Sequence, residues 1–157
     1  MTRNILRGII LAAALFAAAN SSSVSAQTFS GSIAGRSVAR GGLARGSIVM
    51  TIPEGLHVNS FRPSSQYAIA TTVRVSGAGV RIADLTYPRG KNRQFQFSET
   101  PINVYEGRVA FGFTVRVPAG FRGDTVRVRA TVRYQACTDE VCYPPKSKEI
   151  TLTARVR

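Results

Sequence analysis

The sequence of 157 residues contains no tryptophan, one histidine and two cysteines, and its 8 acidic residues are outnumbered by 21 basic ones. Zinc sites usually have four ligands, so such a site in this chain would have to use carboxylates. A copper(I) site on Cys137, Cys142 and His57 is a conceivable alternative. Covalent haem is excluded because the Cys-x-x-Cys-His motif is missing.

Long apolar segments are missing after the amino-terminal region. The one apolar run, residues 8–19, follows Arg3 and Arg7 and precedes a stretch of small residues that ends at Ala26. These are the three parts of a secretory signal peptide, so we expect cleavage after Ala26 and a periplasmic protein. An uncleaved anchor is the alternative, although a spanning helix needs ~20 apolar residues. A disulfide can persist after export.

The excess of basic residues is the next feature. Removing Arg3 and Arg7 from the 21 basic residues leaves 19 against 8 acidic ones, a net charge of +11. Such a charge attracts anionic partners. Nucleic acid is disfavoured because the protein is exported and has no recognisable binding motif. The remaining interpretations are an ordinary solvated surface and attraction to an anionic membrane surface.

The chain changes character near Arg45. Residues 27–44 are rich in Gly, Ser and Arg without an apolar period, which predicts a flexible basic arm. Residues 45–157 contain short β-branched runs bounded by Gly and Pro. Apolar and polar residues alternate in residues 108–117 and 125–134, as in strands with one buried face. Weaker runs occur at residues 47–52, 67–75, 80–86, 94–97, 102–105 and 149–156.

This pattern predicts an all-β fold, an immunoglobulin-like antiparallel β-sandwich, with a small barrel as the alternative. The disulfide that joins the two sheets of antibody domains is not expected, because Cys137 and Cys142 are too close in sequence. If the alternation continues past Tyr134, Cys137 points outward and the cysteine pair lies at the surface, at the end of a strand.

Three roles remain open for the cysteine pair: a redox pair, a structural disulfide or a metal ligand pair. A loop of about six residues gives a disulfide only roughly 2 kcal/mol in the chain-entropy model, which argues mildly against a purely structural role. The charges near the sulfurs oppose one another. Arg133, Lys146 and Lys148 would lower a thiol pKa, whereas Asp139 and Glu140 would raise it.

The cysteine segment resembles a known family. Tyr134-Gln135-Ala136-Cys137, followed after four residues by Cys142-Tyr143-Pro144-Pro145, is similar to the amino-terminal periplasmic domain of DsbD, the thiol:disulfide interchange protein. Two further segments, residues 54–58 and 85–90, also resemble the family and occur in the right order. The resemblance covers about residues 45–156.

The resemblance implies an immunoglobulin-like sandwich that exchanges disulfides with thioredoxin-like partners, as a monomer and without a cofactor. It assigns the mixed disulfide to Cys142 and its resolution to Cys137. A cap loop with an aromatic ring covers the cysteines in the family, and residues 92–100, with Phe95 and Phe97, occupy that place. Phe97 is the expected cap residue.

Two more residues are candidates for the site lining. His57 would either assist proton transfer at the cysteines or simply pack in its strand, and Tyr143 would either cover Cys142 or close the turn. Pro144 and Pro145 lack N–H donors, so they end strand pairing beside the cysteines.

The sequence also departs from the family. The gap between the cysteines is shorter than in well-known members, and the segment Lys91-Asn92-Arg93-Gln94 lacks their acidic cap residues. No counterpart of the family's membrane domain or thioredoxin-like domain is present. Either separate proteins supply the electrons, or the domain has another task, such as a non-catalytic binding module with a structural disulfide.

Overall fold

The computed structural model describes residues 26–157, so the predicted signal peptide lies almost wholly outside the described residues. This part of the chain contains twelve β-strands and one short 3-10 turn, η1. No helix in it is long and apolar enough to cross a membrane. The bounds are β1 Thr28–Ile33, η1 Ala34–Arg36, β2 Ser37–Val38, β3 Leu43–Thr51, β4 His57–Asn59, β5 Thr72–Gly77, β6 Arg81–Thr86, β7 Lys91–Arg93, β8 Ile102–Tyr105, β9 Arg108–Arg116, β10 Thr125–Tyr134, β11 Ala136–Cys137 and β12 Lys146–Val156.

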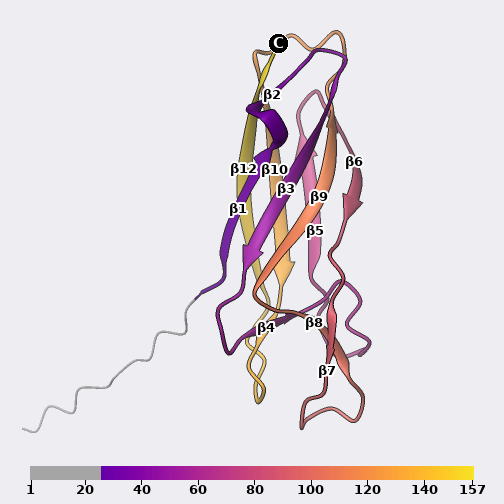
Figure 1. Cartoon of the computed structure of the whole chain (residues 1–157), viewed down its shortest axis with the longest axis vertical. Coiled ribbons are helices and arrows are strands. Elements are labelled where there is room, and N and C mark those ends of the chain that lie inside the picture. Colours follow the sequence, from indigo (N-terminus) through magenta and orange to yellow (C-terminus); the bar gives the residue numbers. More distant parts are fainter. Residues whose placement is uncertain (1–25) are drawn as a thin grey trace, which may run out of the picture.

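The strands form three sheets. Sheet A has the order β1-β3-β9-β6, sheet B the order β2-β12-β10-β5, and sheet C the order β11-β4-β8-β7. All pairings are antiparallel except that of β2 with β12. Sheets A and B form two long layers, and sheet C lies at the end of the molecule opposite the C-terminus (Figure 1). The predicted all-β, immunoglobulin-like sandwich is confirmed.

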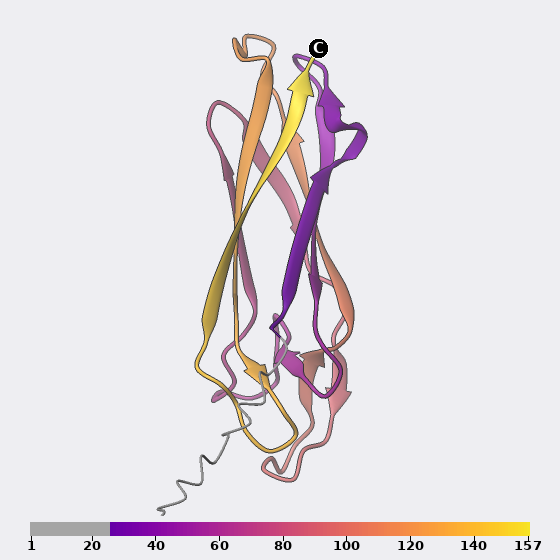
Figure 2. The same cartoon turned by 90° about the vertical axis from the view of Figure 1, so that its left-hand side faces the viewer.

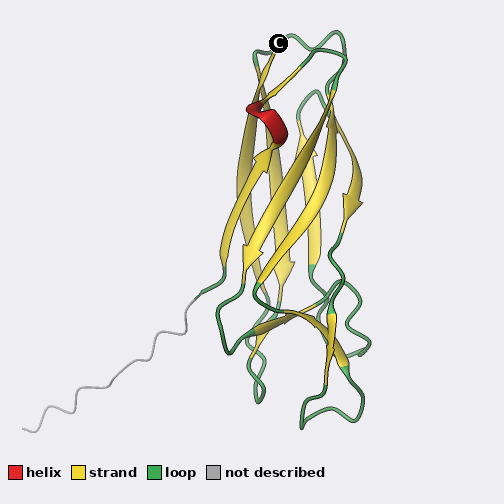
Figure 3. Ribbon diagram, viewed as in Figure 1, coloured by secondary structure: helices red, strands yellow, loops and turns green. Residues whose placement is uncertain are grey.

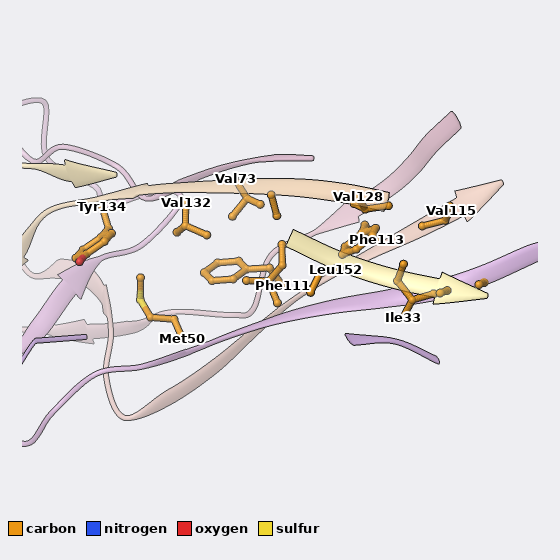
Figure 4. Close-up of a cluster of buried hydrophobic side chains, with 14 of the residues drawn as sticks. Ile33, Met50, Val73, Phe111, Phe113, Val115, Val128, Val132, Tyr134 and Leu152 are labelled. Carbon is orange, nitrogen blue, oxygen red and sulfur yellow. The ribbon is translucent and has the colours of Figure 1, made fainter. Parts of the chain in front are cut away.

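The core between sheets A and B follows from the alternation in the two longest predicted strands. Val126, Val128 and Val132 of β10 have no exposed surface, while the arginines between them are exposed. The opposing residues of β9 include Phe111 and Phe113, which are also buried (Figure 4). Burying each such side chain contributes about 1.5–3 kcal/mol, so this face fixes the register of both strands.

One glycine is required for this packing. Gly46 of β3 lies opposite Phe113 of β9. A Cβ atom added at Gly46 would come within 2.1 Å of the ring of Phe113, far inside contact distance. The aromatic ring therefore covers the backbone of β3, which only a residue without a side chain allows.

The prediction of a flexible arm over residues 27–44 is wrong. β1 pairs with β3 along its whole length, and after η1 the strand β2 pairs with β12 of the other sheet (Figure 3). Ile33 and Val38 are buried in the core. The sandwich therefore begins at Thr28 rather than at Arg45, and one edge of it is closed by a segment that changes sheets.

Two predicted strands also differ from the structure. Residues 94–97 form a loop with a turn at residues 96–97, and the strand of this region is β7, which ends at Arg93. The predicted strand over residues 67–75 begins only at Thr72, and Tyr67 is 86% exposed. Phe95 of the first segment and Ala68 of the second belong to loops and pack against Ile102 and Val104 of sheet C, whereas Val73 and Val75 belong to β5.

Candidate functional site

The two cysteines form a disulfide in a hairpin that leaves the end of β10. The chain passes from β10 through Gln135 into β11, and Cys137 lies directly opposite Cys142. Backbone hydrogen bonds flank the pair, from the Thr138 amide to the Val141 carbonyl and from the Tyr143 amide to the Ala136 carbonyl, both 2.8 Å. The cysteines thus occupy a non-hydrogen-bonded position, where opposed side chains of antiparallel strands come closest.

The four residues between the cysteines form a tight connection organised by Thr138. The Thr138 hydroxyl oxygen accepts hydrogen bonds from the amides of Glu140, at 3.2 Å, and Val141, at 3.0 Å. A hydroxyl that binds amides two and three residues ahead is a common way to stabilise a turn. The hairpin therefore holds the disulfide at the tip of the molecule, beside the β7–β8 loop (Figure 2).

The two sulfur-bearing residues differ in exposure. Cys142 is exposed, whereas Cys137 is 0% exposed. The prediction that Cys137 points outward is wrong, because β11 leaves sheet B and joins β4 of sheet C. This change of sheet breaks the alternation after Ala136, so that Ala136 and Cys137 are buried in succession.

Gln135, which the sequence analysis did not identify, connects the segments around the disulfide. Its side-chain oxygen accepts hydrogen bonds from the Asn59 amide group, at 3.2 Å, and from the Ile69 backbone amide, at 3.4 Å. Its side-chain nitrogen donates to the Tyr143 carbonyl, at 3.2 Å. One amide side chain therefore joins β4, the loop before β5 and the segment between β11 and β12 that carries Cys142.

His57 lies next to the buried sulfur. It is the partner of Cys137 in the pairing of β4 with β11. Side chains of directly opposed residues project from the same face of a sheet, so His57, Cys137 and Cys142 form a row across three neighbouring segments. Burial lowers the pKa of His57 below 6.5, partly opposed by the charges of Asp139 and Glu106. The imidazole is therefore mainly neutral at pH 7.

Two aromatic rings continue from His57. The Phe95 ring stacks on the imidazole with 4.4 Å between centroids, and the Phe97 ring stacks on Phe95 at 5.2 Å. Phe95 is buried with Ile102 and Val104 in a small cluster separate from the main core, whereas Phe97 is 50% exposed. Phe97, His57 and Cys142 line a common cavity of about 230 Å³.

Charged groups connect this aromatic loop to the cysteine hairpin. The Arg93 guanidinium, at the end of β7, contacts the carboxylate of Glu106 and lies 4.0 Å from that of Asp139. These three residues and His57 line a second cavity, of about 420 Å³. The imidazole therefore lies between a cavity that reaches Cys142 and one bordered by carboxylates.

Tyr143 takes the other side of the hairpin. Its ring packs against the main core and lines a small hollow with Leu56, Tyr134 and Pro144. The structure thus brings five of the six candidate residues together, namely Cys137, Cys142, His57, Phe95 and Phe97, and separates Tyr143 from them. Within residues 26–157, no group of three His, Cys, Asp or Glu side chains could hold a metal ion.

Comparison with solved structures shows what this fold is similar to. The N-terminal periplasmic domain of ScsB from Proteus mirabilis aligns with a TM-score of 0.52 and 11% identity, over 82% of this chain and 45% of that chain. The N-terminal domain of DsbD from Neisseria meningitidis in the reduced form aligns with a TM-score of 0.45 and 17% identity, over 70% of this chain and 80% of that chain.

Comparison with sequences identifies the family. A search of curated proteins gave no match. The family model described as "Thiol:disulfide interchange protein DsbD, N-terminal" matches residues 31–154, which include both cysteines, His57 and the two stacked phenylalanines. This range also includes part of the segment that had been expected to be a flexible arm. The chain belongs to the family of the N-terminal domain of the thiol:disulfide interchange protein DsbD.

Proposed function

We propose that the protein exchanges disulfides with thioredoxin-like partners in the periplasm through Cys137 and Cys142. The observation that carries this proposal is the unequal exposure of the two cysteines. A partner's thiolate has to approach one sulfur of a disulfide along the S–S axis. The exposed Cys142 offers such an approach, whereas the buried Cys137 is suited to be the sulfur that leaves.

The exchange then proceeds in two steps. A partner thiolate attacks Sγ of Cys142, the bond between Cys137 and Cys142 breaks, and the sulfur of Cys137 leaves with the electron pair. The second thiolate of the partner attacks the mixed disulfide, which releases Cys142 as a thiolate and leaves the partner oxidised. Passing the electrons onward runs these steps in reverse, with Cys137 resolving the mixed disulfide held by Cys142.

His57 supports the chemistry at the buried sulfur. Burial in an apolar, water-poor position raises the free energy of a thiolate at Cys137 unless a protonated group lies close to it. The imidazole lies opposite Cys137 and is mainly neutral at pH 7, so it can take the thiol proton when Cys137 acts as the attacking group. The cavity lined by Asp139 and Glu106 gives that proton a polar route outward.

Single cysteine variants test the assignment of roles. A thioredoxin-fold protein whose resolving cysteine is replaced by serine, activated as a mixed disulfide with thionitrobenzoate, is the probe. Cys137→Ser leaves the exposed sulfur free and is expected to form the crosslinked complex. The matched Cys142→Ser variant leaves only the buried sulfur and is expected to react at least tenfold more slowly. Equal rates for the two variants, or no complex with either, would overturn the proposal and favour a structural disulfide in a binding module.

A further inference from the structure

The outer face of sheet B carries a set of exposed arginines. The alternation of β10 that buries its valines places its arginines on the opposite side. Two further arginines lie on the same outer side. Arg74 of β5 lies opposite Thr131 of β10, and Arg155 of β12 lies opposite Thr125 of β10. We call this surface the arginine face, and its basic residues are Arg74, Arg127, Arg129, Arg133 and Arg155.

The rest of the arginine face is small and polar. The one carboxylate in its strands, Glu149, lies 3.5 Å from Arg129, so five arginines against one glutamate leave a net charge of +4. Within residues 26–157, no carboxylate pairs with the other four arginines. The residues between the charges are serines and threonines, and none of the exposed large apolar side chains lies on these three strands. These polar residues are Thr72, Ser76, Thr125, Thr131, Ser147, Thr151 and Thr153.

The outer face of sheet A is arranged differently. Three of its arginines, Arg45, Arg81 and Arg116, gather near one end, since Arg81 lies opposite Arg116 and Arg45 opposite Thr114, and a fourth, Arg108, lies opposite Thr51 at the other end. Its middle holds uncharged pairs such as Val49 with Ala110. The arginine face, in contrast, has its charges distributed along the length of β10, from Arg127 to Arg133, which is about 20 Å at ~3.3 Å per residue.

A broad, even distribution of arginines on an open sheet suits a planar anionic partner. One hollow of about 520 Å³ lies at one end of this face, where Arg155 and Arg36 line it. None of the cavities described is lined by the other four arginines, so a small anion in that hollow would leave most of the arginine face uncovered. This face also lacks the exposed aromatic rings on which nucleic-acid bases stack. We propose that the arginine face binds the anionic phospholipid surface of a membrane. Arginine guanidinium groups pair well with phosphate oxygens, and basic residues near such a surface are attracted within about a Debye length.

This contact leaves the cysteines free. The arginine face runs along the long side of the sandwich, whereas the disulfide hairpin projects from one end (Figure 2). A molecule lying on the membrane through sheet B would still present Cys142 to a partner. The inference does not depend on the proposed exchange function, because a Cys137→Ser/Cys142→Ser variant is expected to bind membranes unchanged.

Vesicle co-sedimentation tests the proposal with residues 27–157, which contain all twelve strands. Binding is expected to vesicles of phosphatidylglycerol mixed with phosphatidylcholine but not to phosphatidylcholine alone, and to weaken as salt is added. Replacing Arg74, Arg127 and Arg133 with serine is expected to weaken binding about fivefold for each arginine, or on the order of 100-fold in total. The same three changes to lysine should keep most of the binding, since the charge remains.

A matched variant separates the arginine face from the overall charge. Arg45→Ser, Arg81→Ser and Arg116→Ser remove the same number of charges from sheet A and are expected to weaken binding only slightly. Thermal unfolding of each variant checks that the sandwich is intact. Equal losses for the two serine variants would show that net charge alone governs binding and would overturn the proposal, as would equal binding to vesicles without anionic lipid.

Discussion

The stacked rings at the disulfide end allow one prediction to be worked out in detail. Phe95 lies between His57 and Phe97 and is buried with Ile102 and Val104. Replacing a buried Phe with Ala costs about 3–5 kcal/mol, and each lost aromatic contact accounts for about 0.5–1.5 kcal/mol of it. Because this cluster is separate from the main core, we expect the loss to loosen the loop rather than the sandwich.

The expected size of the local effect follows from these numbers. A loss of ~3 kcal/mol raises the population of the open loop by roughly 100-fold. Phe97→Ala is the matched control, because the half-exposed Phe97 ring contributes only about 1–2 kcal/mol through its buried half and its single stacked contact. The effect of this control should be about tenfold smaller.

Two assays report on the loop and one on the whole fold. Opening should accelerate hydrogen exchange of the Ser98 amide, which donates to the Phe95 carbonyl, and alkylation of Cys137 in the reduced protein. The melting temperature should change little. If the lost energy instead destabilised the sandwich, the melting temperature would fall by roughly 10 °C. That fall, with unchanged exchange at Ser98, would refute the reasoning.

Three further predictions concern single side chains. Burial lowers the pKa of His57 in the folded protein, so the unfolded chain binds the proton more readily and the free energy of unfolding falls as the pH drops below about 6.5. His57→Gln should reduce this loss of stability. The measurement is the difference between the urea midpoints at acid and neutral pH, which should be smaller in the variant. Arg93→Ala breaks the partly exposed pair with Glu106 and should cost at most about 1 kcal/mol in urea unfolding, so a larger loss would contradict a surface role. Tyr105→Phe removes the hydroxyl that accepts a hydrogen bond from the Phe61 backbone amide, and the free energy of unfolding in urea should fall by about 1–3 kcal/mol. An unchanged urea midpoint would contradict this prediction and show that water takes the place of the hydroxyl.

The sequence predicted the parts of the fold in which burial alternates over many residues. β9 and β10 have one face in the core and one in solvent, so their pattern is regular. β1 was missed because its sequence, Thr28–Ile33, contains serines and a glycine and is largely exposed at the sheet edge. β4 and β11 have three and two residues, which are too short for any period to show.

The site was predictable only in part for a related reason. The spacing of Cys137 and Cys142 identified the pair, and the resemblance to the family suggested His57 and the two phenylalanines. The orientation of Cys137 could not be extrapolated from β10, because the chain changes sheets at Gln135. The hydrogen bonds of Gln135 join segments up to 76 residues apart in sequence, and such contacts leave no local pattern.

The central claim is that Cys137 and Cys142 form a redox-active pair, and their reduction potential tests it most directly. Residues 27–157 would be equilibrated in thiol/disulfide buffers, the free thiols trapped with an alkylating agent, and the two forms quantified by mass spectrometry. We predict a potential of roughly −180 to −270 mV, the range of exchange proteins. A potential below about −300 mV, which is typical of structural disulfides, would contradict the account and leave a binding domain with a structural disulfide.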